Sequence, residues 1–599
     1  MALDRPDPRR ECERRLAELE QQAARASALD ARLSWIRLLT FGLTAVLVGR
    51  AAFDPRPGWG WSVAAAAAFG VAVLWHGRVV AVRRHAERGV RYHRRVIDRL
   101  EDRWAGQGQG GDEFTSPDHP YASDLDLFGR GSLFERLTSA RTPAGAATLA
   151  RWLMSPAEPA EILRRQQAVA ELSTRLELRE DLAVAGEDAG DGTDAQGFAN
   201  WAEAPAVPHG RVLAAIAAVL GAANVLGLLV WWSTGRGGIA LAVSLAAGIA
   251  YALALRGRSR RALAGVERRL DELRLLAPLL ARLERERFVA PRLAELRATL
   301  DTAGEAASRR IAGLARIAQT IESRRNLLFA PLAALLLLGT QLALAVERWR
   351  STCGPSVRRW IEAVGELEAL ASLAGYAWER PDDPFPEIVG DGPCFAGEGL
   401  VHPLLSSTGA VPNDVRLEGE LRLLVVSGSN MSGKSTLLRT VGVNAVLAAA
   451  GAPVAARRLR VSPLAVGASM RIVDSLQDHT SHFYAEIRRL ARLVELGRGP
   501  RPLLFLLDEL LHGTNSRDRR VGAEAVLRGL VADGGIGLVT THDLALAAIV
   551  DALAPRAANV HFEDRLEGDR VVFDYRLRPG TVQHSNAIAL MRAVGLDVG

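Results

Sequence analysis

The feature that most constrains this chain is one short segment, Gly428–Ser435, which reads Gly-Ser-Asn-Met-Ser-Gly-Lys-Ser. It fits the pattern Gly-x-x-x-x-Gly-Lys-Ser/Thr, a loop that binds phosphate between a strand and a helix. Its lysine, Lys434, is the only lysine among 74 basic residues. A compact ammonium reaches the β- and γ-phosphates of a nucleotide, and a planar guanidinium is no equivalent replacement. The segment therefore predicts a nucleotide site in an α/β domain.

The sequence on either side of this loop supplies the strand and the helix that it requires. Leu421–Val426 is a mainly apolar run, and Ser435–Leu447 has the pattern of a helix. Backbone N–H groups and the N-terminus of such a helix bind phosphate. We expect ATP and Mg²⁺ as cofactors, with Lys434 also acting in catalysis and the Ser435 hydroxyl binding Mg²⁺. The expected nucleotide-binding residues are Gly428, Ser429, Asn430, Met431, Ser432, Gly433, Lys434, Ser435 and Thr436.

Two further apolar runs end in residues that suit nucleotide hydrolysis. Leu503–Leu507 is followed by Asp508 and Glu509. In this arrangement the first carboxylate holds Mg²⁺ and the second polarises the attacking water. Ile536–Thr540 runs into Thr541 and His542, and a histidine at that strand end would sense or stabilise the γ-phosphate. Glu509, Lys434 and His542 are therefore the predicted catalytic residues, and Ser435 and Asp508 the predicted metal ligands.

Four apolar stretches upstream form two pairs. Leu33–Phe53 and Gly58–Gly77 make the first pair, and Val212–Gly235 and Gly237–Leu255 make the second. About 20 apolar residues suffice for a helix to cross the hydrocarbon core. Tryptophans near the segment ends match an aromatic belt. We expect two transmembrane hairpins; the alternative is buried core helices in a soluble protein.

Arginine-rich flanks set the expected orientation of these hairpins. Arg78–Arg95 follows the first pair and Arg256–Arg261 follows the second. Positively charged flanks stay in the cytoplasm, so we predict a multi-pass protein of the cytoplasmic membrane with its ATPase domain in the cytoplasm. A fifth apolar run, Asn326–Val346, contains Pro331. We interpret it as a buried or membrane-apposed helix, because a fifth span would move the nucleotide site away from cytoplasmic ATP.

The expected fold class is multidomain: helical membrane hairpins and a helical lever or core, followed by an α/β P-loop ATPase domain. Residues 259–325 are strongly helical in pattern and predict a coiled-coil arm or a long lever. The predicted domains are an N-terminal helix with the first hairpin (1–105), a first helical part (113–207), the second hairpin (208–258), a second helical part (259–394) and the ATPase domain (395–599).

Composition adds little about partners. The net charge of +6 permits contact with nucleic acid or anionic lipid. However, 68 acidic residues nearly balance 74 basic ones, which is equally typical of a solvated surface of mixed charge. The three cysteines, Cys12, Cys353 and Cys394, are scattered, with no metal-binding spacing or disulfide pattern, so a reducing compartment is expected.

Around the nucleotide site the sequence resembles the MutS family, whose ATPase belongs to the ABC superfamily. Ser427–Thr436 is similar to the family's T-G-P-N-M-G-G-K-S-T, and Asp508–Ser516 to its D-E-I-G-R-G-T-S-T. Ser481–Glu486 resembles S-T-F-x-x-E, the segment that reaches the partner subunit's nucleotide. Thr541-His542 matches the family's T-H, and Asn559–His561 resembles the N-V-H whose histidine lies against adenine.

The resemblance extends upstream and implies a dimer. Gly399–Leu405 is similar to the family's G-R-H-P element, and Ser132–Leu172 and Gly365–Tyr376 resemble parts of its helical core. It implies that Ser481 binds nucleotide in trans and that His561 contacts the adenine. For Ser481, an ordinary helix cap remains the alternative. The chain departs from the family before residue 120, where a mismatch-reading domain has no room, and at the second hairpin, which interrupts the helical core.

Three functions fit these observations. The first is a membrane-anchored MutS-like ATPase, an ATP-driven homodimeric switch acting on DNA, with mismatch recognition itself in doubt. The second is a mechanical ATPase that works on membrane or protein partners without binding DNA. The third is an ABC-type transporter, which is weakened because the sequence has no Leu-Ser-Gly-Gly-Gln signature. DNA is thus a candidate partner, beside a second copy of the chain and membrane lipid.

Overall fold

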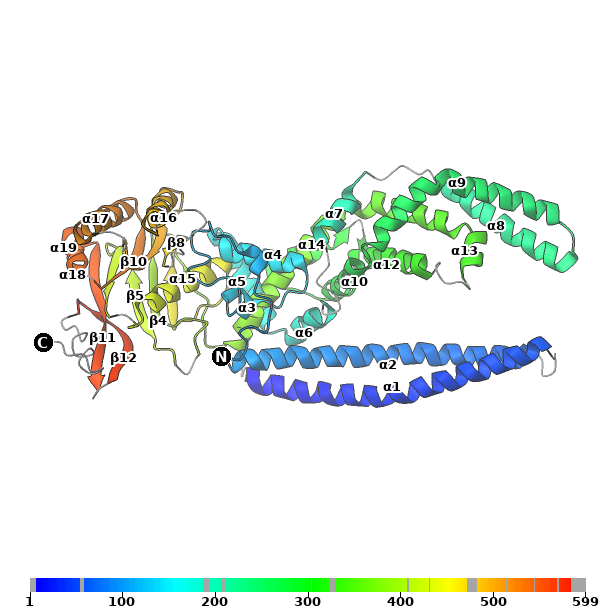
Figure 1. Cartoon of the computed structure of the whole chain (residues 1–599), viewed down its shortest axis with the longest axis horizontal. Coiled ribbons are helices and arrows are strands. Elements are labelled where there is room, and N and C mark those ends of the chain that lie inside the picture. The colour runs from blue at the N-terminus through cyan, green and yellow to red at the C-terminus, as the bar shows by residue number, and fades with distance from the viewer. Residues whose placement is uncertain are drawn as a thin grey trace. The chain divides into compact units, whose positions relative to one another are not determined.

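The chain divides into two compact units, Met1–Trp104 with Glu180–Glu187, and Ala105–Arg179 with Asp188–Gly599. The computed structural model describes residues 7–53, 59–186, 194–205, 211–302, 304–323, 329–406, 409–429, 431–470, 482–511, 515–542, 544–567 and 570–582. Figure 1 labels the helices and strands.

The first unit is a hairpin of two long helices, α1 (Pro8–Phe53) and α2 (Trp59–Leu100), which lie side by side in Figure 1. Both extend beyond the predicted apolar stretches, because the charged flank forms helical ion pairs such as Arg14–Glu18 at 2.6 Å. Asp30 of α1 accepts hydrogen bonds from two residues of α2, His76 at 2.6 Å and Arg83 at 2.7 Å. These contacts fix the register of the hairpin.

The second unit begins with a helical core. Its long central element is α14 (Leu338–Glu379), on which several other helices pack. The remaining helices are α3 (Leu133–Leu137), α4 (Pro143–Met154), α5 (Pro159–Ser173), α6 (Leu176–Ala185, which continues into the first unit), α7 (Ala195–Glu203), α10 (Leu270–Glu284), α11 (Pro291–Thr299), α12 (Ala307–Ser323) and α13 (Ala330–Leu335). A short 3₁₀ turn, Asp112–Phe114, precedes them.

The prediction of one long arm over 259–325 is wrong. The chain there forms the end of α9 (Gly238–Glu267), then α10, α11 and α12, with a two-stranded ribbon, β1 (Asp301–Thr302) and β2 (Glu305–Ala306), before α12. Pro291 starts a new helix and Gly304 takes a φ of +75° in the ribbon turn. Both residues interrupt a helix that the apolar periodicity alone would continue.

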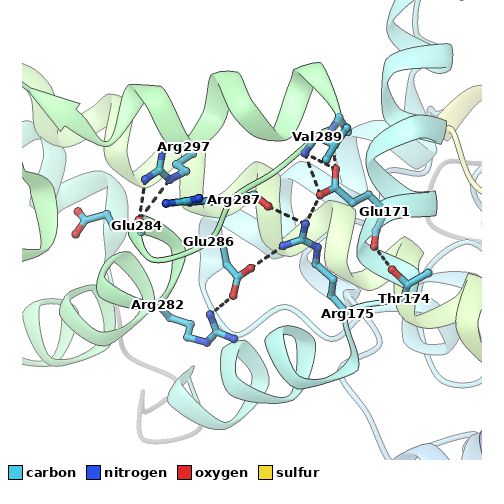
Figure 2. Close-up of polar contacts among 10 residues, drawn as sticks. Glu171, Thr174, Arg175, Arg282, Glu284, Glu286, Arg287, Val289 and Arg297 are labelled. Atoms are coloured by element: carbon cyan, nitrogen blue, oxygen red, sulfur yellow. Dashed lines mark hydrogen bonds and ion pairs between the residues drawn. The ribbon is translucent and has the colours of Figure 1, made fainter.

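Polar contacts hold the loop between α10 and α11 against the end of α5 (Figure 2). The Glu171 carboxylate accepts hydrogen bonds from the backbone N–H groups of Val289, at 3.0 Å, and Ala290, at 2.6 Å. Arg175 donates to Glu286 at 2.6 Å and to the carbonyl of Arg287 at 2.7 Å. These hydrogen bonds reach the loop's own backbone, so they hold the α10–α11 loop against α5.

The second hairpin comprises α8 (Arg211–Thr234) and α9 (Gly238–Glu267), with α13 beside it in Figure 1. The fifth apolar run is a broken segment, α13 followed by α14, with Leu337 at a φ of +51° in the break. Asn224 of α8 donates to the Leu335 carbonyl at 3.0 Å, and Gln341 donates to the Leu336 carbonyl at 2.8 Å. Carbonyls freed by the break are therefore bound by side chains. Residues 326–328 of this run lie outside the described residues.

Four of the described helices, α1, α2, α8 and α9, are long and apolar enough to cross a membrane, by length and composition. Their most apolar windows are 6%, 22%, 17% and 11% buried. Large apolar side chains such as Val219, Leu226 and Ile239 are exposed on α8 and α9. Most of the surface of these helices is therefore exposed in the structure. This does not agree with the alternative that they are buried core helices.

The C-terminal part of the second unit contains two sheets. The larger has the order β12-β11-β6-β10-β9-β8, in which all neighbours are parallel except β11 and β12. Its strands are β6 (Leu423–Ser427), β8 (Ala465–Ser469), β9 (Leu503–Leu507), β10 (Ile536–Thr541), β11 (Ala557–Glu567) and β12 (Arg570–Pro579). The smaller has the order β3-β7-β4-β5, with β3 (Glu387–Ile388), β4 (Phe395–Leu400), β5 (Asn413–Leu417) and β7 (Arg458–Val461).

Helices cover both faces of the larger sheet. Alternate strand residues such as Val425, Phe505 and Val539 are fully buried in one apolar cluster with the helices α16 to α19. Helix α15 (Lys434–Ala450) covers the other face, where a Cβ on Gly442 would come within 2.7 Å of Leu506. The bounds of the covering helices are α16 (His482–Gly497), α17 (Ser516–Ala532), α18 (Leu544–Ala547) and α19 (Ile549–Leu553). The parallel strands thus end at one edge, as nucleotide-binding folds require.

A buried carboxylate joins α14 to the start of α4. Glu368 accepts hydrogen bonds from the backbone N–H groups of Arg141, at 3.0 Å, and Thr142, at 3.2 Å, and from the Thr142 hydroxyl. Burial raises the pKa of Glu368 from 4.5 to about 7, and these hydrogen bonds offset part of the effect. The folded chain therefore binds this proton more tightly than the unfolded chain. The contribution of Glu368 to stability consequently falls as the pH rises from about 4.5 to about 7.

Glu368→Gln should flatten the pH dependence of stability. Because glutamine does not titrate, the loss of stability between about pH 5 and about pH 8, at most about 3 kcal/mol from this group, should disappear. The measurement is the thermal unfolding midpoint in detergent at the two pH values. Glu362→Gln, on an exposed position of α14, is the matched control and should keep the wild-type slope. An unchanged slope in Glu368→Gln would contradict the raised pKa.

Candidate nucleotide site

The predicted phosphate loop joins β6 to α15 at the carboxyl edge of the parallel strands. Gly433 is the N-cap of α15 at a φ of +103° and has no side chain that caps the helix. The first N–H groups of the helix therefore remain available to a phosphate. Met431 also takes a positive φ of +70°, and its side chain is 85% exposed. Asn430 lies outside the described residues, so its predicted role stays a prediction.

Lys434 is folded back onto its own loop. Its Nζ donates to the carbonyl oxygens of Gly428 and Ser429, both at 2.8 Å, and the residue is only 5% exposed. Burial lowers the pKa of Lys434, while the carboxylates of Glu509 and Asp508 act in the opposite direction. The ammonium is thus held at the centre of the loop, close to two carboxylates.

The loop also contains two buried serine hydroxyls. The hydroxyl oxygens of Ser429 and Ser432 have no hydrogen-bond partner among the described residues. A buried hydroxyl without a partner is costly, and a phosphate oxygen would accept a hydrogen bond from it. The loop's chemistry therefore fits a bound polyphosphate.

The predicted acidic pair lies directly after β9, and Thr540 of β10 orders it. The Thr540 hydroxyl donates to the Asp508 carboxylate and accepts from the Glu509 backbone N–H at 3.1 Å. Glu509 has a φ of +48°, a conformation that non-glycine residues rarely adopt. Its carboxylate lies 3.3 Å from the Nδ1 of His542. The three predicted residues Asp508, Glu509 and His542 are therefore brought together at one strand edge.

A cavity of about 510 Å³ opens beside the loop, a volume typical of small-ligand sites. Predicted residues that line it are Met431, Gly433, Lys434, Ser435, Thr436 and Glu509. Val411 also lines it, together with Phe562 and Tyr575. His561 is not among the lining residues; its ring nitrogen Nδ1 lies 3.1 Å from the Gly580 carbonyl oxygen. Its expected adenine contact therefore remains a prediction.

Sequence reasoning missed Thr540 and Tyr575. A threonine at the end of a buried strand, directly before Thr541-His542, was an available signal for the first. Tyr575 belongs to β12, which pairs with β11 to form a C-terminal ribbon. The ring of Tyr575 would lie 3.2 Å from a Cβ on Gly433. Asn413 of β5 binds that ribbon by donating to the Tyr575 carbonyl at 2.9 Å. No local pattern relates Asn413 to Tyr575. Ser481 lies outside the described residues.

A P-loop, an acidic pair and a histidine at one edge of a parallel sheet define a P-loop ATPase domain. Comparison with known protein families matches two models to this chain. Residues 424–598 match MutS domain V, an ABC-type ATPase domain that binds ATP, and residues 122–374 match MutS domain III. The chain therefore belongs to the MutS family. MutS-family proteins typically form dimers.

Curated relatives agree with this assignment. The chain is 37% identical over 242 residues to "DNA mismatch repair protein MutS 2" of Halobacterium salinarum, covering 39% of this chain and 27% of that protein. It is 33% identical over 264 residues to "DNA mismatch repair protein MutS" of Natronomonas pharaonis, covering 43% and 29%. For "DNA mismatch repair protein MSH3" of Phaeosphaeria nodorum the identity is 33% over 245 residues, covering 40% and 22%. The chain spans less than a third of the length of each.

The Thr540 contacts predict a selective loss of turnover. Thr540→Val removes the hydroxyl that orders Asp508 and Glu509, so kcat for ATP should fall roughly 10- to 100-fold, the size expected when a catalytic group is misplaced by about 1 Å. KM for ATP should change little, because Thr540 does not line the cavity. Steady-state kinetics measure both, and Thr540→Ser, which keeps the hydroxyl, should restore turnover. Equal activity of the valine and serine variants would exclude this positioning role.

Proposed function

We propose that this chain is a membrane-anchored MutS-family ATPase, an ATP-driven dimeric switch with DNA as its proposed target. The observation that carries the ATPase part is the convergence of Lys434, Asp508, Glu509 and His542 at one edge of the sheet, where Lys434 and Glu509 also line the cavity. The membrane part rests on four exposed apolar helices that lie outside the ATPase domain. The DNA part rests on the names of the curated relatives.

The residues of the site divide the work of hydrolysis. Lys434 would leave the carbonyls of Gly428 and Ser429 to bind the β- and γ-phosphates, and its charge would offset theirs. Ser435 and Asp508 would hold Mg²⁺, which neutralises phosphate charge when bound. Glu509 would orient and polarise the attacking water. His542, 3.3 Å from Glu509, would hold that carboxylate in place or contact the γ-phosphate.

The dimer completes the proposed site. Ser481 of the partner subunit would donate its hydroxyl to the γ-phosphate, just before α16, whose N-terminus also favours negative charge. Since the γ-phosphate would then bind both subunits, ATP would close the dimer and hydrolysis would release it. This role follows from the resemblance of Ser481–Glu486 to the family's S-T-F-x-x-E.

The helical core offers a route for this switch. Gly451, which ends α15, lies so close to α5 that a Cβ there would come within 2.6 Å of the Cβ of Arg165. Helix α5 in turn holds the α10–α11 loop through Glu171 (Figure 2). The P-loop helix, α5 and this loop therefore form a continuous packed path, along which a movement at the nucleotide would reach the helical core.

A second candidate, a mechanical ATPase acting on membrane or protein partners, is favoured by the second hairpin. Between Val212 and Leu255 the only charged residue is Arg236. DNA affinity depends on several lysine or arginine contacts with phosphate, so this hairpin is unsuited to hold DNA. Titration of DNA onto the full chain in detergent distinguishes the candidates. Binding with a steep salt dependence supports DNA as the target, and no binding at low salt supports the second candidate.

Glu509→Gln should separate ATP binding from hydrolysis. Removing the carboxylate should lower kcat at least about 100-fold while ATP stays bound, and the dimer should accumulate. Nucleotide retention and light scattering with ATP and Mg²⁺ measure the two effects. Lys434→Ala is the paired variant: it should lose turnover and ATP-dependent dimerisation yet remain in the membrane fraction. An unchanged oligomer distribution in Glu509→Gln would contradict the switch.

The proposed topology makes the turn of the second hairpin accessible only from outside the cell. In a variant whose native cysteines are replaced by alanine, Arg236→Cys should react with a membrane-impermeant maleimide added to intact cells. Arg258→Cys, beyond the end of the apolar part of α9, should react only after permeabilisation. Both positions are exposed, so burial in the protein does not explain a difference. Equal labelling of both without permeabilisation would contradict membrane anchoring through this hairpin.

A further inference from the structure

A second cavity, of about 270 Å³, lies where α9 leaves the second hairpin and meets α7 and α14. It shares no lining residue with the nucleotide cavity. The lining residues that matter here are Trp201, Leu255, Arg258, Arg261, Glu347 and Arg350.

The contacts of Asn224 place this cavity at a definite depth if the hairpin spans a bilayer. Asn224 lies near the middle of α8 and binds Leu335 beside the break before α14. Gly248 of α9 lies at the same level, since a Cβ there would come within 3.3 Å of Asn224 and 3.5 Å of Leu337. Ten residues separate Gly248 from Arg258, and ten separate Leu337 from Glu347.

At about 1.5 Å per helical residue, ten residues rise about 15 Å, which is half the thickness of the hydrocarbon core. Arg258 on α9 and Glu347 on α14 therefore both reach the level of the lipid headgroups. The residue count along α9 and the residue count along α14 thus give the same depth for Arg258 and Glu347. The cavity between them consequently opens at the boundary between hydrocarbon and water.

The charges around the cavity favour an anion. Arg350 is fixed inside by Glu347, at 2.9 Å, and by the carbonyls of Trp201, at 3.1 Å, and Ala204, at 2.7 Å. Arg258 lines the cavity, is exposed, and forms no ion pair among the residues that the structure describes. Within the described structure, Arg261 donates one hydrogen bond, from its Nε to the Gly257 carbonyl oxygen at 3.3 Å. Three arginines against one glutamate leave the cavity with a net positive charge.

The walls of the cavity are apolar and continue onto the hairpin. Leu255 is 8% exposed and Leu344 7% exposed. On the same helix α9, Ile249 and Leu253 are about 60% exposed, so apolar surface leads along the helix to the cavity. The guanidinium of Arg350 lies over the Trp201 ring at 5.1 Å, and tryptophan is favoured at the level of the headgroups. A free phosphate would use the arginines but not this apolar surface.

We propose that this cavity binds the headgroup of an anionic phospholipid of the cytoplasmic leaflet. The lipid phosphate is held by Arg258 and Arg261, in the charge-assisted geometry that guanidinium groups form with phosphate. Its acyl chains follow the exposed face of α9. The inference rests on the proposed membrane anchoring of the second hairpin. It gives that hairpin a lipid preference as well as an anchor, at a point where α9 meets α14 of the helical core.

The test uses the full chain in phosphatidylcholine vesicles with a trace of photoactivatable phosphatidylglycerol. Wild-type protein should crosslink on α9 or α14 around the cavity. Arg258→Gln/Arg261→Gln should lower this crosslinking roughly tenfold or more, because two charged hydrogen bonds are lost. Arg256→Gln/Arg260→Gln is the matched control. These two arginines are exposed and lie on the same turns of α9, but neither lines the cavity. This control should retain most of the crosslinking.

Each other outcome has a distinct meaning. Equal losses in the two double variants would overturn the site in favour of general surface charge, as would competition by unlabelled phosphatidylcholine as effective as that by phosphatidylglycerol. Competition by inorganic phosphate would show a site for soluble anions instead. Extraction of the wild-type chain from vesicles by alkaline carbonate would overturn the membrane anchoring itself. A chain that resists extraction and shows equal losses would overturn only the lipid site.

Discussion

The ATPase domain depends on a lysine that is bound by its own loop. Two carbonyl oxygens at 2.8 Å hold the Lys434 ammonium, and the carboxylates of Asp508 and Glu509 stabilise its charge in a buried position. An arginine could not fold into this space with the same contacts, because its guanidinium is larger and planar. The loop, the strand before it and the helix after it are therefore constrained together, and the parallel sheet brings the hydrolytic residues to the same edge.

The same helix connects the nucleotide with the rest of the second unit. Helix α15 starts at Lys434 and ends at Ala450, and its C-cap residue, Gly451, is packed tightly against Arg165 of α5. The carboxylate of Glu171, in the last turn of α5, accepts hydrogen bonds from backbone N–H groups of the α10–α11 loop. A path made of close backbone contacts and buried hydrogen bonds transmits displacement better than one made of exposed ion pairs, which reorient at little cost. This is why we propose that the switch uses the route through α5 and not one over the surface.

The sequence predicted the parts that rest on local pattern. The loop at Gly428–Ser435, the strand Leu503–Leu507 and the apolar stretches were all found from spacing and composition. The structure has helix α15 directly after the loop, strand β9 at Leu503–Leu507 and four long apolar helices at the apolar stretches. Contacts between distant segments were not accessible in this way. The Thr540 hydroxyl acts only because β10 lies beside β9, and Tyr575 reaches Gly433 only because the C-terminal ribbon folds over the loop. The prediction of a long arm over 259–325 failed because the helical periodicity of the sequence continues across Pro291 and Gly304, where the structure starts a new helix and forms a turn.

The break between α13 and α14 is consistent with the proposal that the second hairpin lies in lipid with protein around it. In hydrocarbon, a carbonyl freed from a helix has no water to bind, so such breaks persist only where protein groups replace the lost hydrogen bonds. Asn224 and Gln341 do this for Leu335 and Leu336. Asn224 is 1% exposed in the middle of an otherwise apolar helix, and its amide supplies the hydrogen bond that the break removes from the Leu335 carbonyl. Its presence is explained if the broken segment enters the membrane beside the hairpin to half its depth.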